Sequence, residues 1–183
     1  MTDHAEARSP DLDFSDFYRE QHRGVFASLF VVTGDLSIAA DATDEAFTRA
    51  VSRWDQVSTM ASPGGWVYRV ALNAARRTHR RRSLEERLLH RKPLVDVALD
   101  SSAVEVWEVL RQLPPKQRAV VALKALGDLT EHEIADVLGT SRSTVSSNLA
   151  AARRRLAPQL RRTDPEGDSD GRPHQVRTTA PRD

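Results

Sequence analysis

The clearest pattern of apolar and polar positions lies between residues 129 and 156, on either side of a glycine. The first apolar face consists of Ile134, Val137 and Leu138, and the second of Val145, Leu149, Ala152 and Leu156. The second set is spaced four, three and four residues apart, which places its members on one side of an α-helix. The pattern predicts two short amphipathic helices with a turn at Gly139.

Capping residues mark the ends of both helices. Thr130 and Glu133 form a capping box, Gly139 suits the left-handed end of the first helix, and Ser141 caps the second. Ser143, Ser147 and Arg154 lie opposite the apolar face of the second helix, where short polar groups and guanidinium reach base edges and phosphates. The same pattern also fits a plain αα-hairpin with a polar outer face, which is the alternative to a DNA-binding motif. The arginine run 153–155 favours a DNA-binding helix-turn-helix.

The N-terminal part of the chain also has helical periodicity. Phe14, Tyr18, Val25, Leu29 and Val32 mark a helix that ends near Gly34. A second helix is expected over residues 36–54, with Ile38, Ala42, Ala46 and Phe47 inward. Residues 55–65 read as a loop, and Trp66 opens a third helix that reaches the arginine run 80–82. These three helices are expected to enclose one small core.

The sequence therefore predicts an all-α fold of two small helical domains joined by a flexible linker. The expected boundaries are a disordered N-terminus (1–12), a helical domain (13–82), a linker (83–101), a helix-turn-helix domain (102–162) and a disordered tail (163–183). Trp107 and Leu110 belong to the first helix of the second domain, and Pro114–Pro115 start its next helix. The linker spans at most ~60 Å.

Composition excludes several classes of protein. The chain has no cysteine, which excludes disulfides, thiolate zinc sites and thiol redox sensing. No apolar run approaches the roughly 20 residues of a membrane span, so no membrane insertion is expected. The polar, acidic N-terminus does not read as a signal peptide. A cytoplasmic protein is expected.

The net charge of +1 hides a strong segregation of charge. Residues 65–92 hold nine basic side chains against two acidic ones, and residues 142–162 hold six arginines and no acid. Acidic side chains gather before and between these blocks. Two basic segments separated by segments rich in acidic residues predict two contacts with nucleic acid.

The first basic block contains an ordered stripe. Arg69, Asn73, Arg76 and Arg80 fall within about 60° of one another on a helix of about 100° per residue, whereas Val67, Val70, Ala71 and Ala74 lie on another side. A solvated arginine face is the alternative, but the asparagine within the stripe favours DNA. Trp66 lies at the polar side, where packing under the loop is favoured over DNA contact. Trp54 and Trp107 are expected in the core.

Motifs at both ends of the chain resemble the bacterial sigma-70 family, specifically its extracytoplasmic-function branch. The C-terminal likeness rests on Leu-Pro-Pro-Lys-Gln-Arg at 113–118, Leu-Thr-x-x-Glu-Ile-Ala at 129–135 and Leu-Gly-x-Ser-x-x-Thr-Val at 138–145. The N-terminal likeness rests on Thr-Gly-Asp at 33–35, Ala-Asp-Ala-Thr-Asp-Glu-Ala-Phe at 40–47 and Trp-Val-Tyr-Arg-Val-Ala-x-Asn at 66–73. In that family these blocks form region four and region two.

The resemblance implies a function and a set of site residues. The chain would direct core RNA polymerase to promoters and promote initiation. Region two would bind the minus-ten element through Arg69, Asn73, Arg76, Arg77 and Arg80, with the preceding loop helping to hold a flipped base. Region four would bind the minus-thirty-five element through Arg142, Ser143, Thr144, Ser146, Ser147, Arg153 and Arg154.

The implied protein partners are core polymerase, through its β′ clamp helices and β subunit, and an anti-sigma factor. Asp41, Asp44 and Glu45 match the helix that docks on the clamp helices, although an ordinary solvated face would look the same. The recognition helix departs from the family where Ser146, Asn148, Ala150 and Ala151 replace frequent basic residues. Fewer phosphate contacts predict weaker sequence-independent affinity and a flatter salt dependence.

Two other classes of function compete with this interpretation. A stand-alone helix-turn-helix regulator would act without polymerase, but the N-terminal half has no signature of a ligand or receiver domain. An enzyme is not expected, and no catalytic residue, cofactor or metal is assigned. His132-Glu133 begins like a zinc-protease motif, but Asp136 stands where the second histidine is needed.

Overall fold

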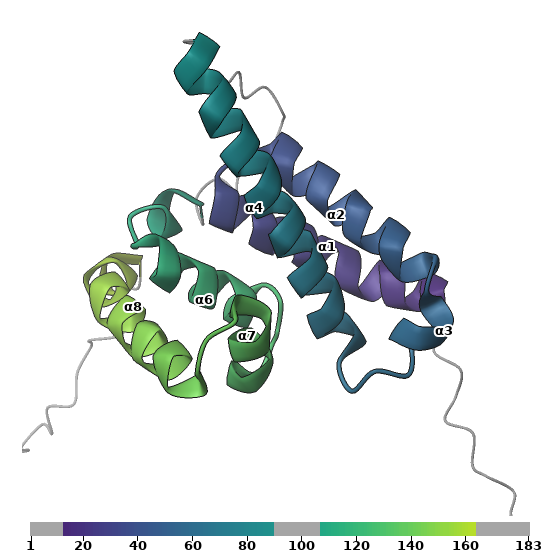
Figure 1. Cartoon of the computed structure of the whole chain (residues 1–183). Coiled ribbons are helices and arrows are strands. Elements are labelled where there is room, and N and C mark those ends of the chain that lie inside the picture. The colour runs from purple at the N-terminus through teal and green to yellow at the C-terminus, as the bar shows by residue number, and fades with distance from the viewer. Residues whose placement is uncertain (1–12, 90–106, 164–183) are drawn as a thin grey trace, which may run out of the picture.

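The computed structural model describes residues 13–89 and 107–163, and its regular elements in these ranges are helices (Figure 1). The N-terminal half (residues 13–89) contains α1 (Phe14–Thr33), α2 (Leu36–Val51), α3 (Trp54–Val57) and α4 (Pro63–Leu89). The C-terminal half (residues 107–163) begins with helical residues 107–110 and continues with α6 (Pro115–Ala125), α7 (Glu131–Leu138) and α8 (Arg142–Thr163). The all-α prediction is confirmed. The expected N-terminus, most of the linker and nearly all of the tail lie outside the described residues.

A tight turn joins α1 to α2. Gly34 ends α1 in the left-handed conformation (φ 71°), and its N–H donates to the Phe30 carbonyl at 2.7 Å. Asp35 then caps α2, because its carboxylate accepts a hydrogen bond from the Ile38 N–H at 2.9 Å. The chain reverses within two residues, which lays the apolar faces of α1 and α2 against each other.

The segment between α2 and α4 differs from the prediction. The second helix ends at Val51 instead of Trp54, and Trp54 starts the short α3. The expected loop 55–65 is reduced to residues 58–62, because α3 extends to Val57 and α4 already begins at Pro63. Val57 is fully buried, which holds α3 against the core. Proline is favourable in a first helical turn, where its missing N–H has no intrahelical partner to lose.

Helix α4 is also longer than expected at its C-terminal end. It was predicted to reach Arg82 and continues to Leu89, so its last seven residues occupy the start of the expected linker. Residues 66–89 contain neither glycine nor proline and are rich in arginine, leucine and alanine, which favour helix. Composition therefore favours continuation of the helix into the start of the expected linker.

The predicted helix-turn-helix is confirmed in detail. The Thr130 hydroxyl accepts from the Glu133 N–H at 3.3 Å, and the Glu133 carboxylate accepts from the Thr130 N–H at 2.9 Å. Gly139 is left-handed (φ 65°), and Ser141 caps α8 by accepting from the Thr144 N–H at 3.2 Å. Ile134 and Val145 are fully buried between α7 and α8.

Replacing Thr130 with alanine is expected to lower the free energy of unfolding by about 1 kcal/mol, because the first turn of α7 loses its hydroxyl acceptor. Urea unfolding followed by circular dichroism measures the change. Thr140→Ala is the matched control, since Thr140 is exposed and lies in the turn outside the cap. Equal losses in the two variants would show that the capping box contributes nothing.

The two halves share one core. Val25, Leu29 and Tyr68 of the N-terminal half belong to the same buried cluster as Leu123 and Ile134 of the C-terminal half. Helix α6 packs against α1, and α7 packs against α4 (Figure 1). A separate core for each half was expected, but the structure joins them. The predicted domain boundaries stay a prediction.

Candidate nucleic-acid and polymerase interfaces

The stripe predicted on α4 is exposed along one side of the helix. Arg69, Asn73, Arg76 and Arg80 are exposed, whereas Val67, Ala71 and Ala74 are buried. The division follows from burying the small apolar residues against α1 and α2, which turns the basic face outward. The stripe can offer guanidinium groups and one amide to a partner.

Arg77 lies next to the stripe and turns toward α2. Its guanidinium donates to the Glu45 carboxylate at 2.7 Å, and Arg49 pairs with the same carboxylate at 2.6 Å. One residue predicted to bind DNA and one predicted to bind polymerase are therefore paired with each other. All three side chains are partly exposed, and such pairs contribute about 1 kcal/mol or less. The Arg77 or the Glu45 side chain can therefore leave this ion pair and bind an external partner at a small cost in free energy.

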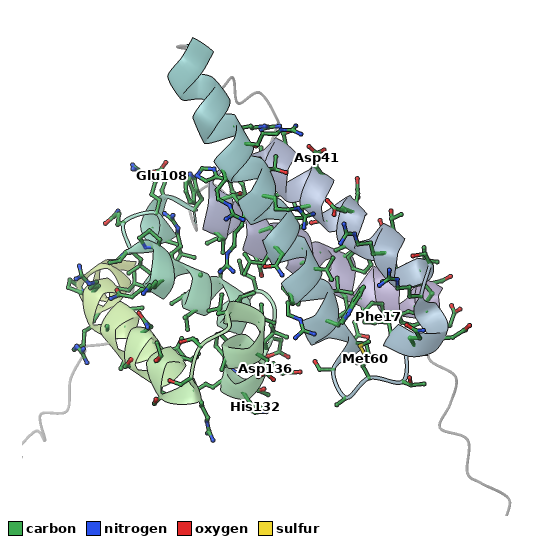
Figure 2. All side chains as sticks on the ribbon, viewed as in Figure 1. Phe17, Asp41, Met60, Glu108, His132 and Asp136 are labelled. Atoms are coloured by element: carbon green, nitrogen blue, oxygen red, sulfur yellow. The ribbon has the colours of Figure 1, made fainter. Side chains whose placement is uncertain are left out.

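The other two acidic residues of α2 are more accessible. Asp41 and Asp44 are exposed, and Figure 2 shows Asp41 on the side of α4 that faces away from α6–α8. The acidic face and the helix-turn-helix therefore lie on opposite sides of α4.

The loop before α4 forms one wall of a small cavity. Met60, Trp66 and Arg69 line it from the N-terminal half, and Glu133 and Asp136 line it from α7, with a volume of about 210 Å³. Figure 2 shows Met60 and Asp136 at the same end of the molecule, in the lower part of the view. Trp66 is half-buried and packs on the core cluster, so the packing role expected for it is confirmed.

Trp54 and Trp107, which were expected in the core, also pack against it from partly buried positions.

The predicted contact residues of α8 are all exposed, but several are bonded locally. The Ser146 hydroxyl donates to the Glu131 carboxylate, and Arg142 lies 3.8 Å from the same carboxylate. Ser143 and Thr144 share hydrogen bonds with the capping hydroxyl of Ser141 at 2.9 and 2.8 Å. Ser147, Arg153 and Arg154 are exposed.

The role of Glu131 was not anticipated from the sequence. Its carboxylate contacts Ser146 and Arg142 near the start of α8 from the preceding helix, and the hydrogen bond with Ser146 spans 15 positions.

Glu133 was recognised only as a capping residue, but it also binds the other half of the chain. The Ser62 hydroxyl donates to its carboxylate at 2.6 Å. This hydrogen bond, followed by the one from the Thr130 backbone amide, holds the pKa of the Glu133 carboxyl below its ordinary value of 4.5. Nothing in the spacing of residues 62 and 133 signals this contact.

The lowered pKa of Glu133 predicts a pH dependence. A carboxyl group whose pKa is lower in the folded than in the unfolded protein stabilises the fold at pH values above its unfolded-state pKa. That stabilisation is lost as the pH falls through the folded-state pKa. The loss in unfolding free energy caused by Glu133→Gln should therefore be constant near neutral pH and shrink below about pH 4.5. Urea unfolding of both proteins from pH 3 to pH 7 measures it. A loss that grows on acidification would contradict the assignment.

The described residues also bear on metal binding and on membrane insertion. Among residues 13–89 and 107–163, no group of three or more His, Cys, Asp or Glu side chains is placed to hold a metal ion. No helix in the part of the chain that the structure describes is long and apolar enough to cross a membrane.

Comparison with known families matches both halves of the chain. The family model described as sigma-70 region 2 matches residues 17–85, and the model described as sigma-70, region 4 matches residues 103–156. The RNA polymerase sigma-E factor of Streptomyces avermitilis is 30% identical, over 84% of this chain and 88% of that protein. The ECF RNA polymerase sigma factor SigW of Bacillus subtilis is 25% identical, over 81% and 88%.

Two solved structures share the fold. The sigma factor RpoE of Bartonella quintana, in complex with the anti-sigma factor NepR, matches with a TM-score of 0.70 and 18% identity, over 81% of this chain and 97% of that one. CnrH, in complex with the cytosolic domain of CnrY, matches with a TM-score of 0.55 and 20% identity, over 81% and 88%. With both sigma-70 regions matched in order and relatives similar along most of its length, the chain belongs to the extracytoplasmic-function branch of the sigma-70 family.

Proposed function

We propose that this protein is a sigma factor that directs core RNA polymerase to promoters by binding the minus-ten and minus-thirty-five elements. The observation that carries the proposal is the pairing, in one sigma-70 chain, of two exposed basic helix faces with a separate acidic face. The basic faces lie on α4 and α8, and the acidic one lies on α2. The protein would perform no chemistry itself and would act in the cytoplasm with the polymerase.

The α4 stripe is assigned to the minus-ten element. Arg69, Arg76 and Arg80 supply charge to phosphates, and the Asn73 amide supplies both a donor and an acceptor to an exposed base. Arg77 joins them on releasing Glu45. Because unpaired bases and their phosphates bind here in preference to duplex, binding favours the melted state of the promoter.

The exposed face of α8 is assigned to duplex DNA at the minus-thirty-five element. The residues assigned to this contact are Arg142, Ser143, Thr144, Ser146, Ser147, Arg153 and Arg154. Hydroxyl groups near the helix start suit base edges, while the arginines further along suit phosphates. Binding by this half alone is expected to be weak, because few cations contact the backbone.

Asp41, Asp44 and Glu45 are assigned to core polymerase. An acidic face repels DNA and suits a basic protein surface, such as the β′ clamp helices of the polymerase. Carrying both DNA contacts on one polymerase makes the second contact effectively intramolecular, so two modest affinities multiply. We also propose an anti-sigma partner, as the Bartonella quintana sigma factor has.

In vitro transcription tests the proposal. Purified chain and core polymerase are incubated with a promoter library, and the transcripts are sequenced. Start sites that appear only when both are present support it, and a chain that never co-migrates with core polymerase would refute it. A stand-alone regulator would instead bind an operator tightly without polymerase, which the sigma-70 match does not favour.

A further inference from the structure

The hydroxyl groups on the exposed face of α8 differ in how firmly their hydrogen atoms are held. A serine hydroxyl has one hydrogen to donate and two lone pairs that accept, so it can meet a base group of either kind. We propose that Glu131 fixes the Ser146 hydroxyl as an acceptor, and thereby sets a preference for adenine or cytosine at one position of the minus-thirty-five element. The inference rests on the proposed function, which places α8 on duplex DNA.

The contact between Ser146 and Glu131 joins the two helices of the helix-turn-helix. Ser146 is exposed on α8, and its hydroxyl donates to the Glu131 carboxylate in the first turn of α7. An ionised carboxylate only accepts hydrogen bonds, so chemistry fixes the direction of this one. Because its single hydrogen is used, the Ser146 oxygen offers only lone pairs to an external partner.

Charge holds the Glu131 carboxylate beside α8. Hydrogen bonds to an ionised group are roughly twice as strong as those between neutral groups. The Arg142 guanidinium, from the first turn of α8, lies 3.8 Å from the carboxylate oxygen that accepts from Ser146. The Glu131 side chain is 33% exposed, whereas that of Arg142 is 75% exposed. Glu131 is therefore held between the helices, while most of the Arg142 side chain stays accessible to a phosphate.

The other hydroxyl groups assigned to DNA have neutral partners. The Ser147 hydroxyl donates to the Thr144 carbonyl at 3.0 Å, within the same helix. Ser143 and Thr144 share hydrogen bonds with the Ser141 hydroxyl in which either oxygen can be the donor. These groups can turn toward whichever base group they meet, because they exchange only neutral hydrogen bonds. Of the four hydroxyl residues assigned to this contact, Ser146 is the one that donates to a charged group.

A fixed acceptor distinguishes bases in the major groove. Adenine and cytosine present an amino group there, which donates hydrogen bonds, whereas guanine and thymine present acceptor atoms. The Ser146 oxygen can bind an amino group, but opposite a keto oxygen it places lone pair against lone pair. The strand that Ser146 contacts should therefore carry adenine or cytosine at that position. One net hydrogen bond corresponds to a preference of roughly 3- to 10-fold.

Glu131 is thus a positioning residue, which acts on the promoter through Ser146. A carboxylate near DNA also repels phosphates, and that repulsion weakens binding to every sequence alike. The two effects differ in what they change. Loss of repulsion raises affinity for all promoters, whereas release of the Ser146 hydroxyl changes the base preference at one position of the minus-thirty-five element.

Glu131→Ala tests the inference in transcription with core polymerase, over promoters randomised in the minus-thirty-five element. The wild-type protein should favour adenine or cytosine over guanine or thymine at one position. Glu131→Ala frees the Ser146 hydroxyl to donate, so this ratio should fall roughly 3- to 10-fold there and stay constant elsewhere. Asp136→Ala is the matched control, because Asp136 is an exposed acid of the same helix that lies 3.8 Å from His132. Circular dichroism checks that each variant is folded.

Ser146→Ala provides the second test, because it removes the acceptor itself. It should abolish the same preference, and adding Glu131→Ala to it should change the base preference no further. The inference is overturned if folded Glu131→Ala keeps the wild-type preference, if it raises transcription equally from all sequences, or if it still alters the preference when Ser146 is absent. Each of these outcomes leaves the proposed function intact. A wild-type protein that gives no specific start sites with core polymerase would instead refute the proposed function, and the inference with it.

Discussion

Replacing Asn73 and Arg76 together with alanine is expected to slow promoter opening by roughly 30- to 1,000-fold, while the affinity for core polymerase stays nearly unchanged. Both side chains are exposed on α4, where their removal leaves the buried face of the helix intact. The estimate corresponds to about 1–2 kcal/mol for each lost base or phosphate contact. Opening is measured by permanganate reactivity of unpaired thymines, and polymerase binding by fluorescence anisotropy of the labelled chain.

A second measurement separates this effect from a general loss of positive charge. Arg23→Ala removes an exposed arginine of α1 that lies outside the stripe, so opening should change by less than about threefold. A promoter that is already melted over the minus-ten element should restore much of the lost activity, because the variant no longer has to drive melting. If the double variant bound polymerase poorly and still opened promoters, the roles assigned to α4 and α2 would be reversed.

Replacing Asp41 and Asp44 together with asparagine is expected to weaken binding to core polymerase by about 3- to 30-fold. Both carboxylates are exposed on α2, so the substitution should alter the outer face without disturbing the core. Amides keep the size and polarity of the side chains but lose the charge that attracts a basic surface. The dissociation constant is measured at several salt concentrations, and the difference between the two proteins should shrink as salt rises.

Glu45→Gln is the informative companion to that pair. It removes the ion pairs with Arg49 and Arg77, so it changes the contact between α2 and α4 as well as the acidic face. If Glu45 also contacts polymerase, the affinity for polymerase should fall; if it only holds Arg77, promoter opening should change instead.

An Asp41 and Asp44 double variant with unchanged polymerase affinity would show that this acidic face is only solvated.

Local interactions explain why so much could be predicted from the chain alone. The capping box at Thr130 and Glu133 and the left-handed Gly139 depend on residues within a few positions of one another. The exposed face of α4 follows from helical periodicity, which needs no knowledge of what the helix packs against. The predicted helix ends were less accurate, because the end of α2 at Val51 and the start of α4 at Pro63 depend on how α3 packs.

Only the tertiary structure decided which predicted residues meet one another. Arg77 pairs with Glu45 across 32 positions, and Ser62 binds Glu133 across 71. No periodicity relates such positions, because helix packing sets their distance. Residue type and local spacing thus determined the helices, their caps and their charged faces. The packing of α6 and α7 on α1 and α4 decided how these faces are placed relative to one another, because shared burial of apolar side chains joins segments that are remote in the chain.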